Sequence, residues 1–444
     1  MGDRPAALER VFDRGGAGDR LGDVDRPCGG TPVIARVERW IPAARTQGER
    51  RALSWAHAPD LDIWLLLTTA VLCAIGLIMV FVASAGVAYT TYGNPAYFFE
   101  RQVVWLLLGG VGLVIGLRLD YHRWRQLGPW LGAASVFLLV AVLVPHIGVQ
   151  VQGARRWIGA GSIEIQPSVI AQFMVVVFGA VWLDQRRRSI TNLREGVIPY
   201  AWRIGVVAAL VILEKDLGST MVVAMVGLGL LVLAGTKLRY LLGLAVTGLL
   251  AGGLLIAAEP YRVARLLAYL NPFAHPLGSG FQAVQALYAF GAGGVFGTGF
   301  SSPVPSAQIL PEAQNDFIFA VIGQDLGLVG TLAVLALFGV FAWRGYQIAK
   351  NAPDHLGALL AGGVTIWIVG QALINIGGVT DTIPSTGVPL TFISYGGSSM
   401  ALSLAATGIL LNISARRRRA GSANARADHG GRNRGPLHPR ASGR

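Results

Sequence analysis

The chain is poor in charged residues and in cysteine. Only 14% of its 444 residues are charged, whereas soluble domains typically carry about a quarter. Its two cysteines, Cys28 in a polar region and Cys73 in an apolar run, provide neither a disulfide framework nor a cysteine-based metal site. The sequence shows no internal repeat, which argues against a transporter built from inverted repeats. The scarcity of charge therefore points toward a polytopic membrane protein.

Apolar residues make up 53% of the chain, and the 59 glycines suit closely packed membrane helices. A helix needs about 20 apolar residues to cross the hydrocarbon core. By this rule we predict an all-α fold with ten transmembrane helices, at residues 62–84, 102–118, 128–145, 167–183, 202–213, 217–235, 239–257, 316–343, 356–377 and 397–413. The sequence Glu214-Lys215-Asp216 separates the fifth from the sixth. A tight turn is favoured there over one long broken helix.

The net charge of +13 gathers in the tails and in certain short loops, which argues against a nucleic-acid partner. Lys and Arg mark cytoplasmic loops of membrane proteins. The connections that would be cytoplasmic contain Arg118, Arg123, Arg125, Arg186, Arg187, Arg188, Arg194, Arg203, Lys237, Arg239, Arg344 and Lys350. This bias predicts that both termini are cytoplasmic. We expect disordered basic tails at residues 1–60, which lack an apolar signal segment, and at 416–444, around a membrane domain at 61–415.

The opposite side of the membrane then holds four substantial loops. They span residues 85–101, 146–166, 258–315 and 378–396, and the largest joins spans seven and eight. The polar and glycine-rich motifs fall in these outer loops or at the adjoining helix ends. We therefore expect any chemistry at the outer face.

The stretch Ile309–Gly327 carries Glu312, Asp316 and Asp325, and joins the largest loop to an apolar run. A carboxylate at the entrance of a membrane helix is costly unless it faces water, a partner or a substrate. Asp316 is therefore the first functional candidate. The alternative is that Asp316 caps the start of the helix, where acidic residues are favoured.

The outer loops contain arginines, although Lys and Arg are usually concentrated in cytoplasmic loops. Arg155 and Arg156 lie in one loop, and Arg262 and Arg265 in another. They either anchor the chain at the interface or hold an anionic group such as a pyrophosphate, which suits guanidinium geometry.

Several of these motifs, in this order, resemble the SEDS proteins (shape, elongation, division and sporulation), the family containing FtsW, RodA and SpoVE. The resemblance spans roughly residues 60–415. The matching segments are Leu310–Gly327, Gly153–Trp157, Ile393–Ser399, Gly278–Gln282 and Asp216–Gly218.

The resemblance implies a peptidoglycan glycosyltransferase that polymerises lipid II at the outer face of the bacterial cytoplasmic membrane during division or elongation. The family's catalytic aspartate falls on Asp316. One carboxylate as general base, with cations for the leaving phosphates, is sufficient for an inverting transfer. The phosphate candidates are Arg155, Arg156, Arg262 and Lys215. A divalent cation such as Mg²⁺ or Mn²⁺ is left open, and no metal ligands are assigned.

Other residues are expected to contact the substrate. Glu312 would share a face with Asp316 if the segment were helical, or it is a solvated loop acid. Asp216 belongs to a matching motif, and Ser394, Tyr395, Gly396, Gly397 and Ser398 line a cavity or form a packing turn. The resemblance also implies a class B penicillin-binding protein (a transpeptidase) as partner, docked among membrane lipids by small-residue packing.

Two positions depart from the family pattern. After the intact Gln166-Pro167-Ser168, Val169 and Gln172 replace a usual Glu and Lys. The joint loss suggests a coupled pair and leaves no orphan charge. The missing pair keeps a non-catalytic assembly scaffold as an alternative to the transferase, and a lipid II flippase, a role proposed for the family that the sequence resembles, is a further alternative. The near absence of charge inside the predicted spans disfavours the flippase.

Overall fold

A computed structural model describes residues 61–145, 147–151, 154–160, 163–278, 280–300 and 310–432. These residues belong to one compact unit, Pro59–Arg444. The predicted tail at residues 1–60 lies outside the described residues.

Each of the ten predicted spans contains one helix. The helices are α2 (Ile63–Tyr92), α3 (Tyr97–Arg118), α4 (Trp124–Leu143), α5 (Pro167–Gln185), α6 (Ile198–Leu213), α7 (Leu217–Leu233), α8 (Leu238–Ala257), α12 (Ile318–Lys350), α13 (His355–Val379) and α14 (Gly397–Arg432). Nine spans in the described part are long and apolar enough to cross a membrane, whereas α7 has only 17 residues. The predominantly helical, polytopic fold is therefore confirmed, and the count of ten spans stays a prediction.

Side-chain caps explain where several helices begin. The Asp62 carboxylate accepts a hydrogen bond from the backbone N–H of Leu65, and Asp354 does the same for Gly357. Asp216 caps α7 through the N–H of Ser219. These oxygens satisfy donors that a helix leaves unpaired in its first turn. The expected turn between spans five and six is present, and Lys215 adopts a left-handed conformation there, with φ of +62°.

Helix α12 is kinked at Gly327, where φ is +66° and ψ is −162°. A Cβ on this residue would lie 2.4 Å from the backbone nitrogen of Gly297. Only glycine accepts both the positive φ and this approach without strain. The kink therefore lets the segment after α10 (Phe281–Gly293) pack against the backbone of α12.

The outer loops are more ordered than the sequence suggested. Residues 146–166 contain an antiparallel sheet with strands β1 (Gly148–Val151), β2 (Ala154–Ala160) and β3 (Ile163–Ile165) in the order β1-β2-β3. The long loop contains α10 and an amphipathic helix, α9 (Pro260–Leu270). The short connections contain η1 (Tyr121–Arg123), η2 (Leu193–Val197) and η3 (Pro272–Ala274).

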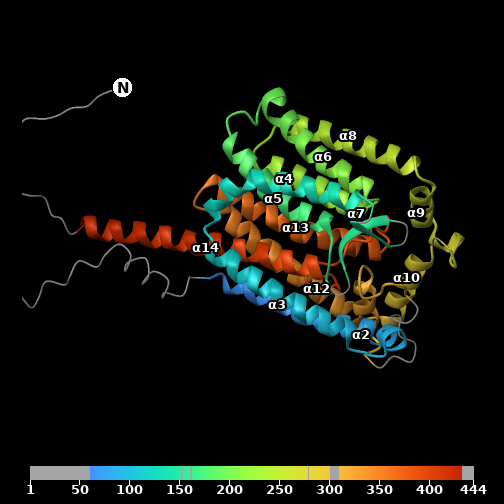
Figure 1. Cartoon of the computed structure of the whole chain (residues 1–444). Helices are drawn as coiled ribbons and strands as arrows, with labels where there is room; N and C mark the ends of the chain where they lie inside the picture. The colour runs from blue at the N-terminus through green and yellow to red at the C-terminus, as the bar shows by residue number, and fades with distance from the viewer. Residues whose placement is uncertain are drawn as a thin grey trace, which may run out of the picture. The chain divides into compact units, whose positions relative to one another are not determined.

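Helices α9 and α10 and the sheet lie at one end of the bundle, opposite the end from which α14 projects (Figure 1). Most residues of α5 and of the membrane part of α14 are buried, whereas none in α8 is. An apolar helix without buried side chains is compatible with lipid, which is itself apolar. Helix α14 continues to Arg432, beyond Arg416, where a disordered tail was expected. Charge alone does not end a helix, because Arg and Ala both favour helical conformation. Residues 433–444 lie outside the described residues.

Candidate active site at the outer end of the bundle

Asp316 lies two residues before α12, at the end of a series of turns that spans residues 311–316. The N-cap of α12 is Phe317, whose apolar side chain makes no capping hydrogen bond. The backbone carbonyl of Asp316 accepts a hydrogen bond of 2.7 Å from the side-chain amide of Asn375 on α13. The structure therefore holds Asp316 by its backbone and does not use it as the N-cap.

Arg265 is the cation that acts on the Asp316 carboxylate. Burial raises the pKa of Asp316 to about 6, against the lowering effects of its own backbone N–H and the Arg265 guanidinium. Arg262, three residues earlier on α9, instead donates a 2.9 Å hydrogen bond to the carbonyl of Leu255 in α8. Sequence analysis ranked Arg262 among the phosphate candidates and left Arg265 unranked. The packing of α9 reverses that ranking.

Glu312 contributes negative charge beside Asp316 and raises its pKa further. The segment between them is not helical, so the expected shared helical face is absent. Glu312 has a positive φ of +57°, and its exposed carboxylate accepts a hydrogen bond from the side-chain amide of Asn315. The Glu312 and Arg265 charges thus act in opposite directions on the pKa of the partly buried Asp316.

The loop between α13 and α14 closes over Asp316. The Arg265 guanidinium donates to the Ser385 carbonyl at 3.4 Å, and Asn375 donates a second hydrogen bond to the carbonyl of Val388. A Cβ on Gly387, whose φ is +68°, would lie 3.5 Å from the Asp316 carboxylate. The sequence offered Gly387 no distinguishing signal beyond its residue type. Asn375 was also missed, although an amide inside an apolar helix marks a polar contact.

A second cluster surrounds Asp216. Its buried carboxylate caps α7 and also accepts hydrogen bonds from the Gln166 amide at 3.1 Å and the Ser168 hydroxyl at 3.2 Å. The matching motifs around Gln166 and Asp216 therefore meet in space. A Cβ on Gly218 would lie 2.5 Å from the Thr386 carbonyl. The loop that touches Asp316 thus also contacts the start of α7.

Arg156 is engaged by the turn between α6 and α7. It is the extra residue of a bulge in β2, since Val149 pairs with Trp157 and Gln150 with Arg155. A bulge re-aims a side chain, and here the guanidinium donates to the carbonyls of Glu214 and Lys215. Arg155 lies beside it in the same strand. The structure therefore gives Arg156 a turn-stabilising contact and leaves the phosphate role of both arginines a prediction.

The glycine- and serine-rich segment that leads into the start of α14 behaves mainly as a packing turn. The Ser394 hydroxyl accepts from the backbone N–H of Leu390, and the Tyr395 N–H donates to the Gln314 carbonyl. A Cβ on Gly397 would lie 2.2 Å from the Trp105 ring, and Ser398 is buried. The Gly396 carbonyl accepts a hydrogen bond from the backbone N–H of Met400 in α14. This segment holds the turns before Asp316 in place.

Arg101 is a further outer-end cation that sequence analysis missed. It stacks over the Tyr97 ring at 4.5 Å. Burial raises the pKa of Tyr395, and the hydrogen bond between Arg101 and the Tyr395 hydroxyl opposes that rise. Its position after the acidic Glu100 at the start of α3 resembles an ordinary interface anchor in sequence.

Val169 and Gln172 are both buried in the first turns of α5. The side-chain oxygen of Gln172 accepts a 2.9 Å hydrogen bond from the indole of Trp367. The Gln172 side chain is therefore uncharged, and its oxygen has a hydrogen-bond partner.

This neutrality predicts non-additive mutations. Gln172→Lys alone buries an unpaired ammonium group and is expected to destabilise the protein by several kcal/mol. Val169→Glu combined with Gln172→Lys should recover part of that loss, because the side chains lie three residues apart on one helix. Thermal unfolding in detergent measures the loss of stability in each variant. A loss in the double variant as large as the sum of the losses in the two single variants would contradict the prediction.

Glu214, at the end of α6, is buried, and both its carboxylate oxygens lack a hydrogen-bond partner among the described residues. Burial raises its pKa to about 8, aided by the neighbouring Asp216 charge and opposed by Arg156. The side chain is therefore mostly protonated at pH 7.

This burial predicts a pH-dependent stability. Between the ordinary pKa of 4.5 and about 8, the folded state binds the proton that the unfolded state has lost, so stability falls as pH rises. The effect is a few kcal/mol at most, since one pKa unit corresponds to about 1.4 kcal/mol. Glu214→Gln should keep the low-pH stability and flatten the slope. Thermal unfolding from pH 5 to 9 tests this, and an unchanged slope would refute it.

The fold and these clusters define a polytopic helical membrane protein with a carboxylate–arginine site at one end of its bundle. The family model of the cell cycle proteins FtsW, RodA and SpoVE matches residues 63–419. The chain is 39% identical to stage V sporulation protein E of Bacillus subtilis over 353 residues, which are 80% of this chain and 96% of that protein. It is 38% identical to the probable peptidoglycan glycosyltransferase FtsW of Trichlorobacter lovleyi, over 80% of this chain and 93% of that protein.

Solved structures agree with these sequence matches. The fold is similar to a chain of a peptidoglycan synthase complex in which polymerization and crosslinking are coordinated, with a TM-score of 0.67, 26% identity, and coverage of 81% of this chain and 98% of that one. It is also similar to the rod shape determining protein RodA of Thermus thermophilus, with a TM-score of 0.59, 26% identity and the same coverage. The chain belongs to the FtsW/RodA/SpoVE family and is a multi-pass protein of the bacterial cytoplasmic membrane.

Proposed function

We propose that this chain is a peptidoglycan glycosyltransferase that polymerises lipid II at the outer face of the membrane. The observation that carries the proposal is the partly buried Asp316. Burial raises its pKa to about 6, and the Arg265 guanidinium keeps that pKa from rising further. A base with a pKa just below the working pH is mostly deprotonated and still accepts a proton effectively. The names of the FtsW relatives support the same activity.

In the proposed step, the Asp316 carboxylate takes the proton of the acceptor sugar's hydroxyl group. The hydroxyl oxygen attacks the anomeric carbon of the lipid-linked donor, and a new glycosidic C–O bond forms. The anomeric carbon–phosphate oxygen bond breaks, and the lipid pyrophosphate leaves with the electron pair. Direct attack from the opposite side inverts the configuration at that carbon. Pyrophosphate is a good leaving group, so a second carboxylic acid is less needed than in glycoside hydrolysis.

Cations must neutralise the departing pyrophosphate. Arg265 is the best placed, and Arg155, Arg156 and Lys215 remain candidates. Among the described residues, no three His, Cys, Asp or Glu side chains gather into a metal site. A Mg²⁺ or Mn²⁺ ion would take most of its ligands from phosphate oxygens, with the exposed Glu312 carboxylate as the nearby protein ligand. Such an ion would screen the negative charge of the leaving group.

We also propose a class B penicillin-binding protein as the partner that crosslinks the product. The similarity to a chain from a peptidoglycan synthase complex supports this pairing. Association within the membrane would rest on close helix packing.

The test is polymerisation of labelled lipid II by the purified chain, with its transpeptidase partner added. Glycan strands are expected. Movement of lipid II across vesicle membranes without strand formation would replace the transferase with a flippase. If a folded complex showed neither strand formation nor movement of lipid II, a non-catalytic scaffold would be the remaining alternative.

A further inference from the structure

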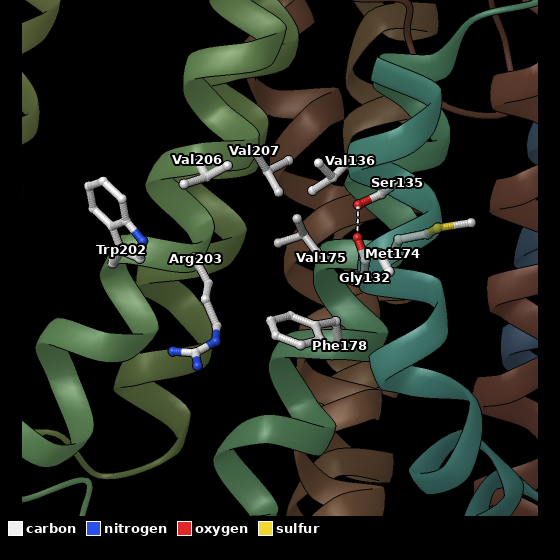
Figure 2. Close-up of a pocket in the computed structure, with 11 residues that line it drawn as sticks. Gly132, Ser135, Val136, Met174, Val175, Phe178, Trp202, Arg203, Val206 and Val207 are labelled. Atoms are coloured by element: carbon white, nitrogen blue, oxygen red, sulfur yellow. Dashed lines mark hydrogen bonds between the residues drawn. The ribbon is translucent and has the colours of Figure 1, made fainter. Parts of the chain in front are cut away.

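An apolar groove opens between α4, α5 and α6, away from the outer-end clusters. It is lined by Gly132, Ala133, Val136, Met174, Phe178 and Val206, among others, and has a volume of about 250 Å³. Valines of α6 face α4 across the opening (Figure 2). The hydroxyl of Ser135 also lines the groove and donates to the Gly132 carbonyl, so it offers a ligand no unpaired donor. The interior therefore suits a hydrocarbon chain.

The groove opens at the membrane-facing surface of the bundle. Trp202 at its rim is 72% exposed, and Ala133 and Arg203 are also exposed. All three helices flanking it are candidate membrane spans. An occupant must therefore come from the lipid phase.

One end of the groove is positively charged. Arg203 lines it and lies over the indole of Trp182 at 5.5 Å from the ring centroid, and Arg186 lies over the same ring at 4.7 Å. Neither guanidinium has a carboxylate partner among the described residues. One nitrogen of Arg203 donates to the Pro199 carbonyl of its own helix at 2.6 Å, and a guanidinium has further N–H groups for a phosphate. The adjoining loop adds Arg187, Arg188 and Arg194, and such arginine-rich connections mark the cytoplasmic side.

We propose that this groove binds an anionic phospholipid of the inner leaflet. One acyl chain fills the space between α4, α5 and α6, and the headgroup phosphate is held by Arg203 and Arg186. Guanidinium groups match phosphate oxygens in geometry and charge, and basic pockets between membrane helices on the cytoplasmic side recognise anionic headgroups. The site is independent of the proposed catalysis at the other end of the bundle.

The experiment measures lipid binding to the full-length protein in detergent by native mass spectrometry. Phosphatidylglycerol is compared with phosphatidylcholine of identical acyl chains. Wild type should prefer phosphatidylglycerol by about thirtyfold, because each of the two guanidinium groups contributes about 1 kcal/mol, or about fivefold, near an anionic headgroup. Arg203→Gln should reduce that preference to about fivefold, and Ala133→Phe, which fills the groove, should weaken binding of both lipids.

Arg239→Gln is the matched control. Arg239 stacks over its own neighbour Tyr240 at 4.8 Å, at the start of α8 and outside the groove, so its loss should leave the preference intact. Soluble glycerol phosphate should not compete, because the acyl chain supplies part of the affinity. Equal binding of the two lipids by wild type, an equal loss in Arg239→Gln, or full competition by glycerol phosphate would each overturn the proposal. Melting temperatures near that of wild type confirm that the variants are folded.

Discussion

Replacing Asp316 with asparagine is expected to reduce lipid II polymerisation by about 10²- to 10⁴-fold, the usual contribution of a general base. Asparagine keeps the shape of the side chain but cannot accept the proton of the acceptor hydroxyl. The backbone hydrogen bond from Asn375 involves the carbonyl of residue 316 and persists in the variant. The loss should therefore appear in the rate of strand formation, with little change in thermal stability.

Two further variants separate proton transfer from charge and position. Asp316→Glu keeps a carboxylate but displaces it by one methylene, so activity should fall between that of wild type and Asp316→Asn. Asp381→Asn removes another carboxylate from the loop after α13, at a φ of +56° that asparagine tolerates. It should change the rate by no more than about twofold. Equal strand formation by wild type and Asp316→Asn would remove Asp316 from the mechanism.

Arg265→Gln should shift the pH dependence of polymerisation upward. In wild type the rate should rise with pH through the Asp316 pKa of about 6 and then level off, because only the deprotonated carboxylate acts as a base. The Arg265 charge lowers that pKa, so its removal raises it. The midpoint of the acid limb should move up by about one pH unit, within the usual range for a lost charge partner. The rate at pH 6 should fall about fivefold, because the deprotonated fraction drops from about one half to about one tenth, and it should fall further if Arg265 also holds the pyrophosphate.

The matched control is Arg262→Gln on the same helix. Its guanidinium binds the Leu255 carbonyl, so its loss should leave the midpoint in place. Glu312→Gln should move the midpoint the opposite way, because the Glu312 charge raises the Asp316 pKa. Rates of strand formation between pH 5 and 8 measure all three variants. An unmoved midpoint in Arg265→Gln, with a folded protein, would show that Arg265 does not act on the base.

The helices of this protein were predictable because their signals are local. Long apolar runs can satisfy their backbone in a membrane only as helices, and Asp216 at the start of α7 both caps that helix and marks the preceding turn. The candidate base was also found from sequence. A carboxylate such as Asp316 at the entrance of an apolar run is costly without a purpose.

Tertiary structure alone decided which groups surround that base. Arg262 and Arg265 lie about one turn apart on α9, so periodicity places both on similar faces. Only the packing of α9 places one guanidinium on the Leu255 carbonyl of α8 and the other on the Ser385 carbonyl, where its charge lowers the Asp316 pKa. Likewise, Asn375 and Gly387 reach residue 316 from 59 and 71 positions away along the chain. Helices and caps are stabilised by interactions between residues that are close in the sequence, so the sequence pattern predicts them. Burial, charge pairing and loop closure depend on contacts between distant segments, which only the tertiary structure determines.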